Sequence, residues 1–297
     1  MRKTILLLVT LALWCVWPAA SFGKLRVVTS TSDLAYLART IGGDQVDVDA
    51  IASPTADVHF VEVRPSFMVK VKKADLVLRV GMELDLWMDR IIDGSRNANL
   101  KVADCSRYIE PLQVPTFKAD ARYGDLHRFG NPHYWLSPDN LEPITRAIAE
   151  GLETADPEHA QTYWEHRDAF LAEIDAALPA VRESAGPLQG VQIIFYHNSW
   201  PYFNAFVGTV AAGFVEPYPG VAPSPSHVAN TIELVRKLGV QVIAVEPYFD
   251  KRVPEKIAAE TGARVVTVYP SVGGRDKNES YLEWLQGNID ALKGALP

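Results

Sequence analysis

The stretch LRVVTSTSDLAYLARTIGGDQVDVDAI, residues 25–51, contains one complete strand–helix–strand unit. The β-rich run at 25–30 predicts a strand, and Ser32-Asp33 then offers a cap for a helix that stops at Gly42-Gly43. A second strand-like run follows at 46–51. Strands joined through a helix pair in parallel within one sheet, so this unit predicts an α/β fold.

The same alternation continues through the first half of the chain and restarts in the second half. In the first half we expect a helix opening at Pro65-Ser66, a strand at 76–80 and a helix from Glu83. In the second half we expect strands at 191–196, 241–245 and 264–268, and helices at 224–239, at 253–262 and from Glu279 onward. Each half therefore predicts its own parallel sheet with helices on both faces.

A long periodic segment separates the two halves. It runs from Pro157 to about Ser184, which corresponds to a helix of roughly 40 Å at 1.5 Å per residue. A shorter periodic segment starts near Asp139, after a loop-like stretch at 107–137. We therefore expect two α/β lobes joined by one long helix. The expected boundaries are an N-terminal lobe at 24–155, a linking helix at 156–186 and a C-terminal lobe at 187–297.

The first 23 residues have the features of a secretory signal peptide. The basic pair Arg2-Lys3 precedes the apolar run ILLLVTLALWCVW, which is too short to span a bilayer, and small residues follow it. Trp14, directly before Cys15, does not fit the small residue that a lipid-anchor site requires. We expect export and cleavage near residues 20–24, so 1–23 is assigned as the signal peptide.

The mature chain would hold a single cysteine, Cys105, which we expect to be buried and inert. Without an internal disulfide, an exported protein of this size depends on its hydrophobic core. The full chain has 29 basic and 36 acidic residues and a net charge of −7, and loss of the two cations in 1–23 changes it to −9. This acidic balance argues against nucleic-acid binding and favours cations or neutral surfaces as partners.

Three of the seven histidines occupy similar places in the expected fold. His59 lies in the loop after the second strand, His133 in a loop before a helix, and His197 directly after the strand at 191–196. Open α/β sheets bind their ligands outside the carboxyl ends of the strands, where such loops converge. Either the three histidines meet in the cleft between the lobes, or each is a hydrogen-bonded residue of the core.

The other four histidines have different settings. His159 and His166 lie on one face of the long helix among charged residues, which indicates a solvated face. His227 is in the first turn of a helix, where a capping role is expected. His127 lies in the loop six residues before His133 and fits either role.

Glu246 is the acidic residue placed best to join the three histidines. It ends the strand at 241–245, so its carboxylate would emerge at the same edge of the sheet. Glu62 and Asp250 lie near His59 and Glu246, respectively. For Asp57 and Asp139, loop and N-cap roles are expected. Imidazoles with at most one carboxylate suit a borderline metal such as zinc, whereas calcium or magnesium would require several oxygen ligands. The sequence has no HExxH, GxSxG, Walker A or GxGxxG motif.

Over essentially the whole mature sequence, the chain resembles the periplasmic zinc- and manganese-binding proteins of ABC metal importers, the cluster A-I group of zinc-uptake/adhesin-type solute-binding proteins. The likeness is carried by VHFVEVRPS (58–66) with KKADLVLRVGMELDLWMD (72–89), NPHYWLSPDN (131–140), FYHNSWPYF (195–203) and VIAVEPYFDKRVPEKIAAETGARV (242–265). The resemblance implies two α/β lobes joined by a long rigid helix, with the metal site in the interlobe cleft.

The resemblance also implies a ligand set. The family's three ligand positions fall on His59, His133 and His197, and a histidine at the third position, where many manganese-type members have glutamate, favours zinc. Many members have a fourth ligand, an aspartate, near the C-terminus, but Pro270 stands at the matching position here. Glu246, His127 or water would then complete the site, and Glu246 is the residue assigned.

These features predict a periplasmic solute-binding protein, not an enzyme, that captures Zn²⁺ rather than Mn²⁺ and delivers it to an ABC permease in the inner membrane. We expect a monomer with no nucleic-acid partner. Metal binding needs deprotonated imidazoles, which titrate near pH 6.5 when unperturbed, so the affinity should fall on acidification through that region. Two alternatives would use the same site: a zinc-dependent periplasmic hydrolase, and a metallochaperone or cell-adhesion protein.

Overall fold

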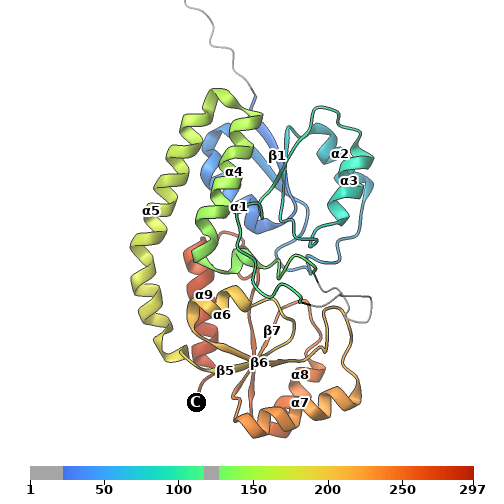
Figure 1. The fold of residues 1–297 in the computed structure, drawn as a ribbon, viewed down its shortest axis with the longest axis vertical. Coiled ribbons are helices and arrows are strands. Elements are labelled where there is room, and N and C mark those ends of the chain that lie inside the picture. Colours follow the sequence, from blue (N-terminus) through green and yellow to red (C-terminus); the bar gives the residue numbers. More distant parts are fainter. Residues whose placement is uncertain (1–22, 117–126) are drawn as a thin grey trace, which may run out of the picture.

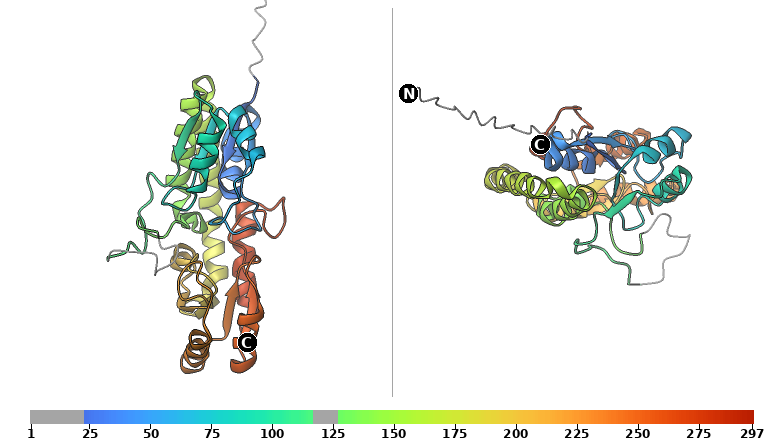
Figure 2. Two further views of the ribbon diagram at one scale, coloured as in Figure 1. Left: turned by 90° about the vertical axis from the view of Figure 1, so that its right-hand side faces the viewer. Right: turned by 90° about the horizontal axis from the view of Figure 1, so that it is seen from above.

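The computed structural model describes residues 23–116 and 127–297. Two lobes, each built on its own sheet, are stacked along the long axis of an elongated molecule (Figures 1 and 2). The expected signal peptide at 1–23 lies outside the described residues, apart from Gly23. No helix within 23–116 or 127–297 has the length and apolar character needed to cross a membrane.

The N-terminal lobe contains a four-stranded parallel sheet in the order β2-β1-β3-β4. Its strands are β1 (Leu25–Thr29), β2 (Val46–Ala50), β3 (Leu76–Arg79) and β4 (Lys101–Asp104). Its helices are α1 (Ser32–Gly42), α2 (Pro65–Lys73), α3 (Trp87–Ser95) and α4 (Leu141–Ala155), with short 3₁₀ turns at η1 (Gly43–Gln45), η3 (Tyr134–Leu136) and η4 (Pro138–Asn140). The central strands β1 and β3 are mostly apolar and buried, as expected for parallel strands whose faces are both covered.

The C-terminal lobe repeats this arrangement with the strand order β6-β5-β7-β8, again all parallel. Its strands are β5 (Gln192–Phe195), β6 (Val210–Phe214), β7 (Val242–Val245) and β8 (Arg264–Thr267). Its helices are α6 (Pro201–Val207), α7 (Pro225–Leu238), α8 (Arg252–Thr261) and α9 (Tyr281–Gly294). In both lobes the first strand of the lobe lies inside the sheet, between the second and the third.

The long helix α5 (Ala160–Ala185) runs beside both lobes (Figure 1). Its 26 residues give a length of about 39 Å. It packs on α1 and α4 of the N-terminal lobe and on α9 of the C-terminal lobe, and it is flanked by η5 (Pro157–His159) and η6 (Gly186–Leu188). The helix therefore supports the two lobes from one side.

A single cluster of buried apolar side chains extends through both lobes. Trp135 of the N-terminal lobe and Trp284 of the C-terminal lobe belong to this same cluster. A second, smaller cluster includes Val235 of α7 and Ile257 of α8 at the far end of the C-terminal lobe. Because the main core crosses from one lobe to the other, the lobes are held together by packing as well as by α5.

The expected fold class is confirmed: two parallel-sheet α/β lobes are bridged by a long helix. One helix boundary was wrong, because α3 begins at Trp87 rather than at Glu83. Met82 and Glu83 have φ values of 50° and 67°, in the left-handed region, so the chain there forms a turn and not a helix. The sequence patterns also gave no indication of β6 or α6.

Candidate metal centre

His59 lies in the loop between β2 and α2, and Asp57 fixes its orientation. One carboxylate oxygen of Asp57, Oδ1, accepts the backbone N–H of His59 at 2.9 Å and lies 2.7 Å from its ring Nδ1. The loop itself is anchored by Trp87, whose Nε1 donates to the carbonyl of Val58 at 2.9 Å. With Nδ1 occupied, Nε2 is the nitrogen that remains for a ligand.

His133 precedes η3, and Asn131 fixes its orientation in the way that Asp57 fixes that of His59. The Oδ1 of Asn131 accepts the backbone N–H of His133 at 3.1 Å and lies 2.9 Å from its ring Nδ1. The amide nitrogen of Asn131 donates to the carbonyl of Asn198 in the C-terminal lobe at 2.7 Å. Next to the histidine, the hydroxyl of Tyr134 donates to the carbonyl of Val80, just past β3, at 2.6 Å. The His133 loop is thus fixed to both lobes.

His197 follows β5 and brings the C-terminal lobe to the site. The backbone N–H of Tyr196 donates to Ala244 at 2.9 Å, and the backbone N–H of Glu216 donates to Tyr196 at 3.2 Å, so the chain stays close to both neighbouring strands. This places the carboxylate of Glu216 in a hydrogen bond with the Nδ1 of His197. Each of the three histidines therefore has an oxygen partner for Nδ1.

The three imidazoles converge on one point. Among the described residues, His59, His133 and His197 form the one group of potential ligand atoms that all lie within 4.8 Å of one another. Their ring centroids are 4.9–5.5 Å apart. They are only 9%, 2% and 4% exposed, respectively. The Nε2 of His59 is buried and has no hydrogen-bond partner in the described part of the chain, as expected for an atom that awaits a ligand.

Burial controls the protonation of these groups. Burial, and secondarily the charges of His59 and His197, hold the pKa of His133 well below its ordinary value of 6.5. Burial raises the pKa of the Glu216 carboxyl to about 8. For Asp57, burial raises the pKa, but the hydrogen bond and charge of His59 outweigh it and leave the pKa below its usual value. The neutral imidazole of His133 is the form that binds a metal ion.

A cavity of about 200 Å³ between the lobes opens onto two of the three histidines, His133 and His197. Its walls include His133, Asn131 and Gln113 from the N-terminal lobe and His197 and Pro219 from the C-terminal lobe. This volume is large enough to hold a metal ion. A metal bound there would therefore contact both lobes.

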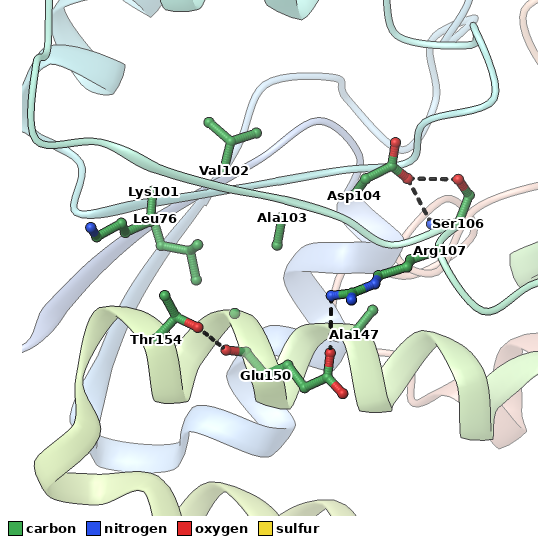
Figure 3. Close-up of a pocket in the computed structure, with 11 residues that line it drawn as sticks. Leu76, Lys101, Val102, Ala103, Asp104, Ser106, Arg107, Ala147, Glu150 and Thr154 are labelled. Atoms are coloured by element: carbon green, nitrogen blue, oxygen red, sulfur yellow. Dashed lines mark hydrogen bonds and ion pairs between the residues drawn. The ribbon is translucent and has the colours of Figure 1, made fainter.

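A larger pocket, of about 370 Å³, lies elsewhere, beside β4 and α4 (Figure 3). Three of its charged residues have partners within the pocket: Arg107 lies 3.6 Å from Glu150, and Asp104 accepts two hydrogen bonds from Ser106. None of its lining residues is a histidine or a cysteine. It therefore lacks the donor set that distinguishes the cavity between the lobes.

Glu246 emerges after β7 but lies outside the three-histidine group. Its Oε1 accepts the indole N–H of Trp200 at 2.8 Å and the hydroxyl of Ser199 at 3.2 Å, whereas its Oε2 has no hydrogen-bond partner among the described residues. Burial raises the pKa of this carboxyl to about 8. Its assignment as a ligand stays a prediction.

The remaining histidines divide into one near the site and three away from it. The ring of His127 stacks on His59 with a centroid distance of 5.4 Å. The others bind to groups outside the site, since His159 pairs with Asp156, His166 with the carbonyl of Ile41, and His227 with the carbonyl of Phe214.

The segment that carries Pro270 has a structural role. The carbonyl of Pro270 accepts the indole N–H of Trp135, two residues after His133, at 2.8 Å. The hydroxyl of Tyr281 donates to the carbonyl of Trp135 at 3.2 Å. The segment thus binds the His133 loop through its backbone, and Pro270 has no side-chain donor to offer a metal.

Three residues that position the histidines were missed as such from the sequence: Asp57, Asn131 and Glu216. The first two carry a signal that could have been found, because each lies two residues before its histidine in the sequences DVH and NPH. Glu216 is 19 residues from His197 and reaches it through the pairing of β5 with β6. No local pattern connects that pair.

Comparison with known proteins identifies relatives over almost the whole chain. Residues 27–295 match the family model described as zinc-uptake complex component A, periplasmic. The chain is 26% identical to the iron-binding protein YfeA of Yersinia pestis, over 93% of this chain and 87% of that protein. It is 23% identical to the manganese-binding lipoprotein MntA of Halalkalibacterium halodurans, over 92% and 88%. A crystal structure of ZnuA superposes with a TM-score of 0.77 at 26% identity, over 92% of this chain and 98% of that one.

Proposed function

This chain belongs to the family of periplasmic zinc-uptake component A proteins, and we propose that it captures Zn²⁺ and delivers it to an ABC-type permease in the inner membrane. The family consists of metal-binding, substrate-binding components of importers and not of enzymes. The metal ion is thus cargo that the protein binds and releases unchanged.

The observation that carries this proposal is the convergence of three imidazoles whose Nδ1 atoms already have oxygen partners. A metal-bound histidine uses its second ring nitrogen in this way, because the partner fixes the tautomer and the direction of the ring. His59, His133 and His197 would hold the metal through Nε2, at bond lengths of about 2.0–2.1 Å. The family membership supports the same residues as ligands of the transported ion.

The donor set favours zinc within this family, whose relatives are named for zinc, manganese and iron. Imidazole nitrogens suit zinc, copper and nickel, whereas manganese prefers carboxylate and water oxygens. The carboxylates nearest the three rings, Asp57 and Glu216, bind to Nδ1 atoms. The set of three imidazoles therefore favours Zn²⁺ over Mn²⁺.

We further infer that residues 1–23 direct export as a cleaved signal peptide and that the protein acts in the periplasm as a monomer. The basic start and short apolar run of this segment support cleavage, and the family description supports the location. The mass of the protein isolated from the periplasm tests the cleavage: a chain starting near residue 24 is expected, and a lipid-modified Cys15 would overturn it.

Zinc binding by single-histidine variants tests the ligand assignment. Apo-protein with His59→Ala, His133→Ala or His197→Ala should lose most of its zinc affinity in competition with a chromogenic chelator. His159→Ala, in η5 before the long helix and away from the site, is the matched control and should bind like the wild type. The assignment is wrong if all three site variants retain full stoichiometry and affinity.

Metal preference needs a separate measurement. Apo-protein dialysed against equal concentrations of Zn²⁺, Mn²⁺ and Fe²⁺ under anaerobic conditions should contain zinc when the bound metal is determined by elemental analysis. Bound manganese in excess of zinc would contradict the zinc assignment, while leaving the three histidines in place as ligands.

A further inference from the structure

We propose that His127 is the fourth ligand of the metal site, so that four histidines surround the ion. The inference rests on the proposed function, because it adds a donor to the same three-histidine group. It assigns a role to the loop before η3, which lies in the N-terminal lobe.

The ring of His127 is in contact with the site. It stacks on His59 at a centroid distance of 5.4 Å and an interplanar angle of 26°. His127, His133 and His197 line the same cavity of about 200 Å³. The fourth ring therefore lies against His59 and borders the same cavity as His133 and His197.

The Nε2 of His127 is a buried polar atom without a hydrogen-bond partner among the described residues. The residue is only 7% exposed, so water does not readily replace the missing partner. Unpaired buried polar atoms are rare in folded proteins and are costly when nothing fills them. The Nε2 of His59 is in the same condition, and the two rings are neighbours. A cation between the rings would satisfy both atoms.

The backbone next to His127 is held in place. Arg128 donates through its backbone N–H to the carboxylate of Glu83 at 3.1 Å and through its Nε at 2.8 Å. Three residues later, the N–H of Asn131 donates to the carbonyl of Leu112 at 2.8 Å. These bonds attach the chain directly after His127 to the N-terminal lobe, which keeps its ring near His59.

Glu246 is less well placed for the same role. The Oε1 of its carboxylate binds Trp200 and Ser199, and Glu246, unlike His127, does not line the cavity that His133 and His197 border. His127 lies outside the group whose ligand atoms are all within 4.8 Å, so its ring has to move inward on binding. Tetrahedral zinc with bonds of 2.0–2.1 Å places its ligand atoms about 3.3 Å apart, so the other three rings must also draw together.

The test combines affinity with a count of ligands in the zinc-loaded protein. X-ray absorption at the zinc edge should show four imidazoles in the wild type and three in His127→Ala. Because loss of even an outer hydrogen-bond partner weakens metal binding by roughly 10–100-fold, loss of this ligand should raise the dissociation constant for zinc at least that much. Glu246→Gln and the surface control His159→Ala should retain both wild-type values.

A count of three imidazoles in the wild type would overturn the proposal. This measurement uses the wild-type protein alone, so it does not depend on whether a variant folds. An unchanged dissociation constant in His127→Ala, or a matching loss in Glu246→Gln alone, would also overturn it. Failure of the proposed function looks different: the wild type would bind no zinc, or the His59, His133 and His197 variants would bind it normally. Circular dichroism of each variant ensures that affinities are compared between folded proteins.

Discussion

Asp57 and Asn131 each hold two groups of the histidine that follows two residues later. In both cases one side-chain oxygen accepts the backbone N–H and lies within 3 Å of the ring Nδ1. The backbone bond fixes the start of the side chain and the ring bond fixes its end. The Nε2 lone pair is thereby directed toward the other histidines of the group before any metal arrives, which reduces the ordering that binding requires.

Replacement of Asp57 by alanine should weaken zinc binding by roughly 10–100-fold, because His59 loses the acceptor that fixes its tautomer and direction. Chelator competition with the purified apo-protein measures the change. Asp44→Ala, at an exposed carboxylate in η1, is the matched control and should bind zinc like the wild type. Equal affinities for Asp57→Ala and the control would show that the hydrogen bond does not prepare the site.

Glu216→Gln should lower the zinc affinity by roughly tenfold, at the lower end of the range for outer hydrogen-bond partners. Burial raises the pKa of Glu216 to about 8, but the charge of a bound metal ion favours the ionised carboxylate. The amide can still accept the N–H of His197 Nδ1, but it lacks the negative charge that strengthens the bond in the metal-bound state and makes the ring a better donor. Glu233→Gln on the exposed face of α7 supplies the comparison. No change, or an equal change in both variants, would exclude a role for the Glu216 charge.

At the level of elements, the contact between α1 and the segment after β8 links the two lobes. The Oδ1 of Asp33 accepts the N–H of Val272 at 2.9 Å, and the hydroxyl of Ser32 donates to the Val272 carbonyl at 3.1 Å. Asp33 is buried, and burial raises its pKa from 3.8 to about 7. The first turn of α1 therefore carries a carboxyl group whose ionisation is unfavourable in the folded protein because the group is buried.

Because the folded-state pKa of Asp33 exceeds the unfolded value, the folded chain holds this proton more tightly between pH 4 and pH 7. The free energy of unfolding should therefore fall as the pH rises through this window, and the contribution of Asp33 should stay constant above it. Asp33→Asn keeps an acceptor for Val272 and removes the charge, so it should stabilise the protein at pH 8 by on the order of 2–4 kcal/mol.

Urea unfolding of Asp33→Asn and wild type at several pH values measures this effect. The variant should show a flatter pH profile between pH 4 and pH 7, whereas Asp44→Asn should keep the wild-type profile. A pH profile for Asp33→Asn that matches the wild type would mean that Asp33 ionises freely in the folded protein.

The elements that the sequence predicted are the strongly patterned ones. The buried strands β1, β3, β5 and β7 are short apolar runs, and α5 is a long periodic segment, so both stand out without tertiary information. The strand β6, with the sequence VAAGF, is partly exposed, lies at the edge of its sheet and contains small residues, so its strand character depends on pairing with β5.

The site could likewise be predicted only where a local sequence pattern marks the residue. His59 and His197 were found because each follows a predicted strand, and His133 because it lies in a loop directly before a predicted helix; parallel sheets collect their ligands at such loops. Glu216 was missed together with β6, since its place beside His197 follows from strand pairing. For His127, the stack on His59 depends on how the loop before η3 folds back, which no local pattern encodes.

At the scale of the molecule, a metal at this site would join two lobes that already share one apolar core. Binding to the folded state alone stabilises it by about 2.7 kcal/mol when the free ligand is at 100 times its dissociation constant. For a protein of this size, that corresponds to a rise of roughly 5–10 °C in the melting temperature. Zinc should therefore raise the melting temperature of the apo-protein, and a chelator should reverse the change.

Differential scanning calorimetry with and without zinc measures this shift. Magnesium at the same concentration should leave the melting temperature unchanged, because it requires oxygen ligands. His133→Ala should also lose the zinc-dependent rise. A rise of the same size in this variant would place the stabilising zinc elsewhere on the protein.

The division of the donors between the lobes has a consequence for the speed of metal exchange. His59 and His133 belong to the lobe of β1–β4, whereas His197 extends from β5 in the other lobe, and the Asn131–Asn198 hydrogen bond crosses the same boundary. With bonds of only about 2.0–2.1 Å, a separation of the lobes by a fraction of that length would detach His197 and leave the ion under-coordinated. The shared core and α5 resist such opening in the isolated protein, so spontaneous dissociation should be slow. A receptor that binds both lobes and moves them slightly apart would then speed the dissociation of the ion. It would not need a higher affinity for the ion than the protein has.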